Sequence, residues 1–299
     1  MTRILVTGGS GFTGRYLTEL LAERGEEVHV LAHKAPSVPV TGARDVHVAD
    51  LTDLAAVSAI VDGVRPERVV HLAAIAFVAH GDVEEMYRTN VVGARQLLEA
   101  LARSDAQPSS VIVASSANIY GNARGGTLQE DMLPAPVNDY GVSKVAMELV
   151  ARLYSGKLPI TVVRPFNYTG VGQPPEFLIP KIVSHARERA PVIELGNLDV
   201  ARDFLDVRTV ADAYMRLLDA PEAIGGTFNI ASGQATTLRD VLDMVARLSG
   251  HEMEVRVNPA FVRADEVRLL CGSAARLESV IGPLRPIPLE ETLRWMLES

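Results

Sequence analysis

A tyrosine and a lysine stand four residues apart in the run YGVSK, at positions 140 and 144. On a helix this spacing places both side chains on one face. Hydride transfer at a carbinol carbon requires a matching proton transfer at its oxygen, and a free phenol, with a pKa of about 10, is a poor base at neutral pH. An ammonium group about 4 Å away would contribute roughly 4 kcal/mol at an effective dielectric of 20. We therefore expect Lys144 to lower the pKa of Tyr140, and Tyr140 to be the catalytic acid or base.

Ser116 is the third member of the predicted catalytic set. It follows a β-branched run at 111–115 and precedes Tyr140 by 24 residues (140 − 116). Ligands of an open parallel sheet bind at the carboxyl ends of its strands, so all three side chains should meet there. Ser116 would hold the substrate oxygen, and Lys144 would also reach the ribose hydroxyls of a nicotinamide nucleotide. The alternative is an exposed tyrosine and a solvated lysine on a surface helix.

A glycine-rich turn near the N-terminus predicts where that nucleotide binds. The run TGGSGFTG at 7–14 follows a strand-like stretch and precedes a helix-like one. Its glycines would tighten the turn, let backbone N–H groups approach a pyrophosphate, and let the helix pack on the sheet. The alternative is a simple turn without a ligand. The predicted contacts in this turn are Gly8, Gly11, Phe12, Thr13 and Gly14.

The ends of the next two predicted strands bear on the type of dinucleotide. An NAD-selective site usually offers Asp or Glu to the adenosine ribose at the end of the second strand, where this chain has LAHK at 31–34. A 2′-phosphate could bind Lys34, so NADP(H) is favoured over NAD(H); the alternative for Lys34 is a solvated loop charge. Asp50 and Leu51 follow the third strand. Asp50 would accept from the adenine amino group or, alternatively, cap the helix that begins near 54.

The elements that must position these residues alternate along the first half of the chain. Short β-branched runs are followed by segments of helical length and spacing. This alternation predicts an α/β fold with a doubly wound parallel sheet covered by helices. The expected strands are 4–7, 28–32, 46–49, 68–73, 111–115 and 160–164, and the expected helices are 14–24, 54–61, 84–103 and 140–154.

The second half of the chain has a different texture. A Gly/Pro-rich loop at 167–175 leads into short helix, strand and loop pieces and a closing helix at 289–297. We expect a dinucleotide-binding domain at 1–165 and a smaller, interleaved substrate domain at 166–299. Strands near 205–207 and 227–231 are expected to return to the sheet of the first domain.

Composition excludes several classes of partner. The net charge is −8 and no run of Lys or Arg exceeds two residues, so neither nucleic acid nor an anionic membrane is expected as a partner. Cys271 is the single cysteine, which excludes an intramolecular disulfide, a CxxC motif and a thiolate metal cluster. No metal is expected. Neither a signal-like segment nor a run of roughly 20 apolar residues is present, and a reducing cytoplasm is the expected location.

Six motifs together carry a family resemblance: TGGSGFTG at 7–14, HLAA at 71–74, NVVG at 90–93, SSANIYG at 115–121, YGVSK at 140–144 and RPFNYTG at 164–170. The chain resembles the extended short-chain dehydrogenase/reductases, which include nucleotide-sugar epimerases, dehydratases and reductases. The resemblance covers essentially the whole chain. It implies a Rossmann fold, an NAD(P) cofactor and a nucleotide-sugar substrate.

The same resemblance assigns roles to further residues. It implies that Leu72, Ala73 and Ala74 line the cofactor. Asn90 would support a water-bearing proton relay or the active-site helix, and the alternative is a helix-capping residue. The dipeptide at 164–165 would lead into the nicotinamide pocket, whereas His71 is expected to be a packing residue rather than a ligand. A homodimer through a four-helix bundle is also implied, because the helices at 84–103 and 140–154 are more apolar than one buried stripe requires.

The choice of reaction follows from two regions. Sugar-nucleotide dehydratases have Thr-Asp-Glu where this chain has SAN at 116–118, so dehydration is not expected. The second half resembles the GDP-4-keto-6-deoxymannose reductases. By that resemblance Arg202 and Arg263 clamp the diphosphate. The other implied substrate residues are Glu266 at the nucleotide ribose, and Asn167 and Lys181 at phosphate or sugar hydroxyls.

We therefore expect NAD(P)H-dependent reduction of the C4 ketone of a GDP-4-keto-6-deoxyhexose. A nucleotide-sugar 4-epimerase with bound NAD is the first alternative. A non-catalytic dinucleotide sensor is the alternative from another class, and the complete Ser, Tyr and Lys set argues against it.

Overall fold

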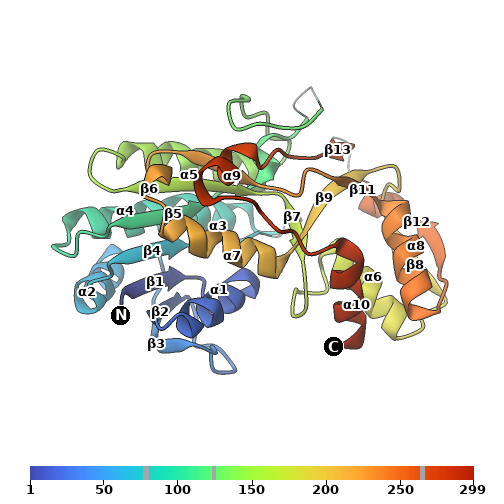
Figure 1. Cartoon of the computed structure of the whole chain (residues 1–299), viewed down its shortest axis with the longest axis horizontal. Helices are drawn as coiled ribbons and strands as arrows, with labels where there is room; N and C mark the ends of the chain where they lie inside the picture. The colour runs from blue at the N-terminus through green and yellow to red at the C-terminus, as the bar shows by residue number, and fades with distance from the viewer. Residues whose placement is uncertain (77–80, 123–125, 263–266) are drawn as a thin grey trace.

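A seven-stranded parallel sheet forms the centre of the larger lobe in the computed structural model (Figure 1). The structure describes residues 1–76, 81–122, 126–262 and 267–299. The strand order is β10-β6-β5-β4-β1-β2-β3, so the chain winds outward in both directions from the centre, as predicted for a doubly wound α/β fold. The strands are β1 (Arg3–Thr7), β2 (Glu27–Ala32), β3 (Ala43–Val48), β4 (Arg68–His71), β5 (Ser110–Ala114), β6 (Ile160–Pro165) and β10 (Thr227–Ile230).

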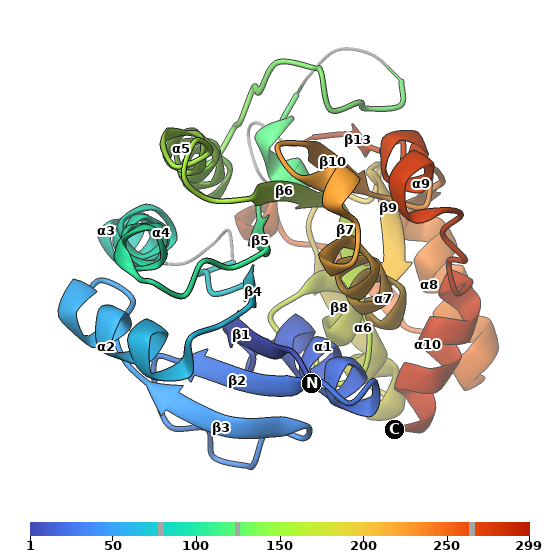
Figure 2. The ribbon, with the colours of Figure 1, turned by 60° about the vertical axis from the view of Figure 1, so that its left-hand side comes forward.

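Helices cover both faces of this sheet (Figure 2). One face packs against α1 (Phe12–Glu23) and α7 (Val207–Leu218), and the other against α2 (Leu54–Val64), α4 (Ala94–Arg103) and α5 (Asp139–Leu153). Because side chains alternate along a strand, Ile4 and Val6 belong to the first core and Leu5 to the second. Burial on both faces explains why the strands consist of nearly continuous apolar runs.

The helix expected at 84–103 is divided into three pieces. It consists of α3 (Val83–Tyr87), a π-helical segment at Arg88–Gly93, and α4. The wider π-helical turn places Asn90 inside the fold, where it is 1% exposed. Such turns are often found at functional sites. Apolar spacing cannot reveal them, because the flanking segments keep ordinary helical periodicity.

In the described part of the chain, the smaller lobe is built from short strands and three helices. β9 (Ala201–Asp206) pairs with β7 (Asn167–Thr169), β11 (Ala235–Thr237) and β13 (Leu269–Leu270), and β8 (Val192–Leu195) pairs with β12 (Glu254–Val257). α6 (Leu178–Arg187), α8 (Leu238–Ser249) and α10 (Leu289–Glu298) share one core. Within the described ranges, no helix has both the length and the apolar character needed to cross a membrane.

The two segments expected to return to the main sheet differ in their placement. β10 forms its edge strand beside β6. The expectation for 205–207 is wrong, because residues 205 and 206 end β9 in the smaller lobe and α7 begins at Val207. The edge beside β6 is occupied by β10, and β9 instead pairs in parallel with β7, which follows β6 along the chain but does not belong to the main sheet. The remaining short elements are α9 (Ala275–Ile281) and the 3₁₀ turns at Ala117–Ile119, Pro221–Ala223 and Pro259–Phe261.

Candidate active site

Ser116, Tyr140 and Lys144 lie together beyond the carboxyl end of β5. Lys144 Nζ donates to the carbonyl of Ala114 at 2.8 Å, and it lies 5.9 Å from the centroid of the Tyr140 ring. A side-chain hydrogen bond joins Tyr140 to Ser116. The structure therefore brings together the three residues that spacing alone could not prove to be neighbours.

The start of α5 fixes this arrangement. The Asn138 side chain caps the helix by accepting from the backbone N–H of Gly141 at 2.8 Å. Gly141 also lies against the 3₁₀ turn that contains Asn118, and a Cβ at this glycine would stand 2.7 Å from the Asn118 carbonyl oxygen. The glycine thus permits the close approach that places Tyr140 beside the end of β5.

Burial dominates the protonation of the catalytic pair. Burial raises the pKa of Tyr140 well above 10, and the hydrogen bond with Ser116 opposes this rise only in part. Burial also lowers the pKa of Lys144 to about 8, against the opposing effect of the Glu148 carboxylate. The expected net lowering of the Tyr140 pKa is therefore wrong for this structure, because the effect of burial outweighs those that oppose it. Tyr140 is a protonated phenol at neutral pH, suited to donate a proton.

Asn90 connects two parts of the site from the π-helical segment. Its Oδ1 accepts from the backbone N–H of Ile75 at 2.8 Å, and its Nδ2 donates to the Ile75 carbonyl at 3.1 Å and to Ser143 Oγ at 3.0 Å. Ser143 in turn donates to the carbonyl of Tyr140 at 2.8 Å. Asn90 thus supports α5 and the segment after β4, and these hydrogen bonds do not cap a helix.

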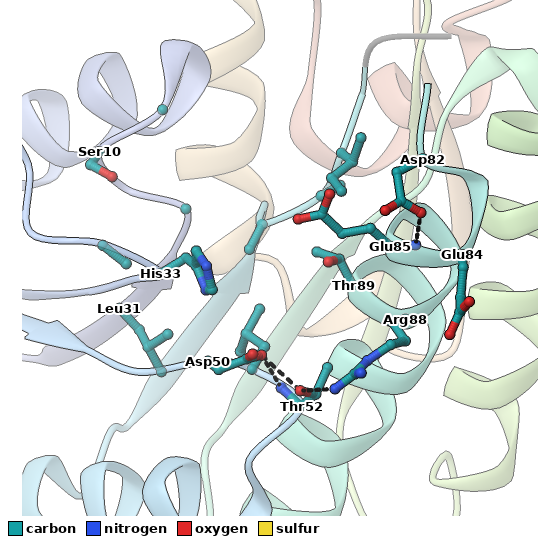
Figure 3. Close-up of a pocket in the computed structure, with 17 residues that line it drawn as sticks. Ser10, Leu31, His33, Asp50, Thr52, Asp82, Glu84, Glu85, Arg88 and Thr89 are labelled. Atoms are coloured by element: carbon teal, nitrogen blue, oxygen red, sulfur yellow. Dashed lines mark hydrogen bonds between the residues drawn. The ribbon is translucent and has the colours of Figure 1, made fainter. Parts of the chain in front are cut away.

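A cavity of about 730 Å³ opens between the glycine turn, the ends of β2 and β3, and the segment around α3 (Figure 3). Six predicted cofactor residues line it: Gly8, Gly11, Asp50, Leu51, Ala73 and Ala74. The cavity is also lined by residues for which the sequence predicted no contact with the cofactor, including Ser10, His33, Thr52, Asp82, Glu85, Arg88 and Thr89. Ser10 lies within the glycine motif and His33 lies beside Lys34, whereas Asp82, Glu85, Arg88 and Thr89 belong to no motif and line the cavity because α3 and the π-helical segment lie across the strand ends.

The glycine turn has the geometry that a dinucleotide diphosphate needs. Gly8 adopts φ +71°, and a Cβ there would stand 2.8 Å from the backbone nitrogen of Ala73. Gly14 packs against the turn itself, since a Cβ would clash with the Gly8 carbonyl oxygen. α1 begins without a side-chain cap, because its N-cap residue is Gly11. The N–H groups of its first turn and the positive end of its dipole therefore suit an anionic group.

Asp50 and Lys34 have different surroundings at the adenosine end of the cavity. Asp50 accepts from the backbone N–H and the hydroxyl of Thr52, each at 2.8 Å, and these hydrogen bonds lower the pKa of Asp50. The capping alternative for Asp50 is wrong, because Asp53 caps α2. Lys34 is exposed and lies outside the lining, whereas its neighbour His33 lines the cavity.

The other predicted cofactor residues of this region are not among the lining residues. The side chains of Phe12 and Thr13 contact Tyr168 of β7, with the Phe12 ring stacked on the tyrosine ring and Thr13 Oγ1 lying 2.8 Å from its hydroxyl. Leu72 packs against the core beneath α1 and α7. These side chains therefore join structural elements in this structure.

Two further residues of the motifs are structural. His71 is 3% exposed and its Nδ1 lies 2.7 Å from Thr7 Oγ1, and burial lowers the pKa of His71 to about 3. Arg164 donates to both carboxylate oxygens of Glu148, at 2.9 and 2.8 Å, and to the Tyr120 hydroxyl at 3.0 Å. Arg164 thus links β6 to α5, one turn beyond Lys144, and does not line the cavity.

The predicted substrate residues are spread over the smaller lobe. Asn167 begins β7, and its buried Oδ1 has no hydrogen-bond partner among the described residues. Lys181 Nζ donates to the Glu194 carbonyl at 2.7 Å and lies 4.4 Å from the centroid of the Phe261 ring. Arg202 donates to the carbonyl of Ala201 at 2.9 Å. Two predicted members of the set, Arg263 and Glu266, lie outside the described residues.

Comparison with known proteins decides the family. The model of the NAD dependent epimerase/dehydratase family matches residues 4–231. The chain belongs to this family. The match confirms the resemblance to extended short-chain dehydrogenase/reductases, and it includes the glycine turn, the predicted catalytic set and the strand β10.

Named relatives of this family member act on nucleotide sugars. GDP-6-deoxy-D-talose 4-dehydrogenase of Aggregatibacter actinomycetemcomitans is 36% identical over 94% of this chain and 91% of its own length. GDP-6-deoxy-D-mannose reductase of Pseudomonas aeruginosa is 34% identical over 99% and 96%. The crystal structure of a provisionally named epimerase from Burkholderia cenocepacia J2315 has a TM-score of 0.91 at 47% identity, covering 99% and 97% of the two chains.

Proposed function

We propose that this enzyme reduces the C4 ketone of a GDP-4-keto-6-deoxyhexose with NAD(P)H and forms GDP-6-deoxy-D-mannose, also called GDP-D-rhamnose. The observation that carries the proposal is the position of the buried Tyr140 phenol, which is hydrogen-bonded to Ser116 and lies beside Lys144 at the carboxyl end of β5. Reduction requires a proton donor at the carbonyl oxygen. The names of the two relatives, a GDP-6-deoxyhexose 4-dehydrogenase and a GDP-6-deoxyhexose reductase, support a C4 oxidation or reduction of such a sugar.

The mechanism assigns one role to each catalytic side chain. The nicotinamide, when bound, supplies a hydride to C4. Ser116 donates a hydrogen bond to O4 and orients the carbonyl, and Tyr140 transfers its phenolic proton to the same oxygen as the hydride arrives. Lys144 remains cationic below its pKa of about 8, where it stabilises the negative charge left on the phenol. Hydride at C4 and proton at O4 together give the alcohol.

The surroundings of Ser116 support reduction over dehydration. Asn118 donates to Ser116 Oγ from both its backbone N–H and its Nδ2, each at 3.2 Å. This amide orients the serine hydroxyl but cannot move protons at C5 and C6. A dehydratase would need carboxylates at positions 117 and 118.

We propose NADP(H) as the favoured cofactor and NAD(H) as the second choice. The lining residues at the end of β2 are Ala32 and His33, neither of which repels a 2′-phosphate as a carboxylate would. Lys34 is the adjacent cation, although it lies outside the lining. The ratio of kcat/KM for NADPH and NADH measures the preference directly, and a higher value for NADH would contradict it.

One assay tests the proposed reaction against its alternatives. GDP-4-keto-6-deoxymannose is added to the protein with NADPH or NADH, and loss of absorbance at 340 nm is followed together with the sugar product. A reductase consumes one reduced cofactor for each sugar. An epimerase interconverts sugars without net consumption, and a sensor binds the cofactor without turnover; either result contradicts the proposal.

The stereochemistry at C4 has a second candidate. The relative with 36% identity is named for the talose sugar, which differs from the mannose sugar at C4. The H3–H4 coupling constant in the proton NMR spectrum of the product separates the two, because H4 is axial in the mannose product and equatorial in the talose product. A talose product would keep the reductase assignment and reverse the face of hydride delivery.

We also propose that the enzyme is a dimer through α4 and α5. Leu149 and Leu153 on α5 are 54% and 78% exposed, and Val142 on the same helix is 40% exposed. Their spacing of seven and four residues makes one apolar stripe on a helix. Other apolar positions do not contribute, because they are buried within the chain itself: Leu97, Leu98 and Leu101. Light scattering at micromolar concentration should give twice the mass of the chain. The Leu153→Glu variant should have a lower measured mass, closer to that of the monomer.

A further inference from the structure

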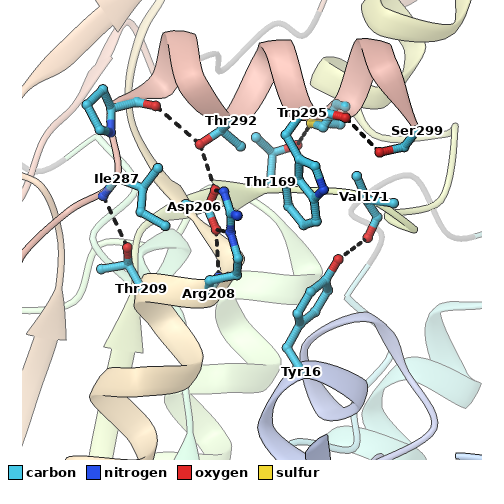
Figure 4. Close-up of polar contacts among 12 residues, drawn as sticks. Tyr16, Thr169, Val171, Asp206, Arg208, Thr209, Ile287, Thr292, Trp295 and Ser299 are labelled. Atoms are coloured by element: carbon cyan, nitrogen blue, oxygen red, sulfur yellow. Dashed lines mark hydrogen bonds and ion pairs between the residues drawn. The ribbon is translucent and has the colours of Figure 1, made fainter. Parts of the chain in front are cut away.

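One face of α1 contacts the strand that leads into the smaller lobe. Thr13 Oγ1 and the Tyr168 hydroxyl are 2.8 Å apart, and the Phe12 and Tyr168 rings stack with their centroids 6.0 Å apart and their planes at 9°. One turn later, the Tyr16 hydroxyl donates to the Val171 carbonyl at 2.7 Å (Figure 4). Three side chains of α1 thus contact the segment 168–171.

This contact joins the two halves of the proposed site. Thr13 is the second residue of α1, whose uncapped N-terminus follows the glycine turn. Tyr168 directly follows Asn167, whose Oδ1 has no hydrogen-bond partner among the described residues. Because side chains alternate along a strand, Tyr168 faces α1 while Asn167 points to the opposite side of β7. The position of Asn167 is therefore tied to the first turn of α1.

The surroundings make the contact well ordered. Burial raises the pKa of Tyr168, so its hydroxyl stays neutral and can donate. Tyr16 meets the Trp295 ring edge-on at 6.0 Å, and the Arg208 guanidinium lies 4.0 Å from the centroid of that same ring (Figure 4). Arg208 is itself paired with Asp206 at 2.7 Å. The α1 face, β7 and α10 therefore form one packed junction.

We propose that Tyr168 is a positioning residue. It couples dinucleotide binding at the glycine turn to the placement of Asn167, which is proposed to bind the sugar. The inference rests on the proposed function for the role of Asn167. A diphosphate at the N-terminus of α1 orders its first turn, Thr13 holds Tyr168, and Tyr168 holds β7 with the Asn167 Oδ1 available to a sugar hydroxyl. By linkage, each ligand then tightens the binding of the other by the same factor.

The test measures coupling between the two ligands by calorimetry. The Kd of GDP-mannose, or of UDP-glucose if it binds more tightly, is measured with and without saturating NADPH, because the probe must carry the sugar hydroxyls that Asn167 is proposed to bind. One hydrogen bond between hydroxyls corresponds to about fivefold in affinity, so the wild type should show coupling of about that size. Tyr168→Phe and Thr13→Val should each reduce the factor below about twofold, and the double variant should reduce it no further. Thr13→Ser keeps the hydroxyl and should retain the coupling.

Controls separate this role from a general loss of stability. Tyr154→Phe removes a comparable hydroxyl, which donates to Glu99 at 2.8 Å between α5 and α4, and should leave the coupling factor unchanged. Wild-type protein that binds neither NADPH nor the nucleotide sugar contradicts the proposed function. Wild-type protein that binds GDP-mannose equally well with and without NADPH contradicts the coupling alone. If Tyr168→Phe lowers only the unfolding temperature, Tyr168 is structural and the inference is wrong.

Discussion

The proposed catalytic residues at the carboxyl end of β5 and the proposed substrate residues of the smaller lobe hold their polar side chains in different ways. We call the second group, Asn167, Lys181 and Arg202, the substrate arm. Tyr140 and Lys144 are 8% and 3% exposed, and their neighbours fix them before any ligand binds. In the arm, the charged groups of Lys181 and Arg202 donate to backbone carbonyls. If these side chains bind phosphate, as proposed, we expect their charged groups to turn away from these carbonyls. The geometry of the proposed catalytic set is thus preformed, whereas we expect the proposed substrate contacts to require rearrangement.

The largest expected effect tests the preformed end. Tyr140→Phe removes the proton donor and keeps the ring, so turnover should fall by about 10²-fold or more while the cofactor Kd changes less than about twofold. Stopped-flow reduction and fluorescence titration of NADPH measure the two quantities. Turnover close to that of the wild type would place the proton donor elsewhere.

Lys144→Met should separate activity from stability. Burial lowers the Lys144 pKa from 10.5 to about 8, so the folded protein holds a cation at pH 7 at a cost of about 3 kcal/mol. Losing the hydrogen bond to Ala114 offsets about 1 kcal/mol of the gain. The free energy of unfolding, measured in urea, should therefore be about 2 kcal/mol higher for the variant than for the wild type. The variant should nevertheless turn over poorly and bind the cofactor weakly. A destabilised variant would contradict the direction of the pKa shift.

The same lysine gives a pH dependence. The folded-state pKa of about 8 means that Lys144 loses its charge as the pH rises through 8, so kcat should fall there. The cost of the buried cation disappears over the same range, and the unfolding free energy should rise between about pH 8 and 10.5 as far as this group is concerned. In Lys144→Met the stability component near pH 8 should be absent.

The smallest of these effects tests the arm. Arg202→Ala removes a cation proposed to bind the diphosphate, and the KM of the nucleotide sugar should rise about tenfold. Cofactor affinity should stay within about twofold, because β9 lies outside the glycine turn. Arg263→Ala, whose position lies outside the described residues, provides the matched comparison. If the KM is unchanged in both variants, the prediction that these arginines bind the diphosphate is wrong.

This difference between the two regions also decides what could be predicted from sequence. The glycine turn and the Tyr-Lys pair are local motifs, and the strands around them are continuous apolar runs, so the fold and the catalytic set could be predicted. The contact of Thr13 with Tyr168 spans 155 residues, and the pairing of β9 depends on which strand occupies the sheet edge. Contacts between distant parts of the chain produce no recognisable spacing of residues in the local sequence. The burial that raises the Tyr140 pKa is likewise a property of the whole fold.

The π-helical segment at Arg88–Gly93 limits how this region can change in length. Each residue of an α-helix turns the chain by about 100°, so removing one residue here would restore regular winding but rotate Asn90 away from Ile75 and Ser143. Regular winding would stabilise the helix by itself, but the site would lose the hydrogen bonds that Asn90 makes with Ile75 and Ser143. Among related chains that keep Asn90, we expect insertions and deletions to fall on either side of 88–93 and not within it.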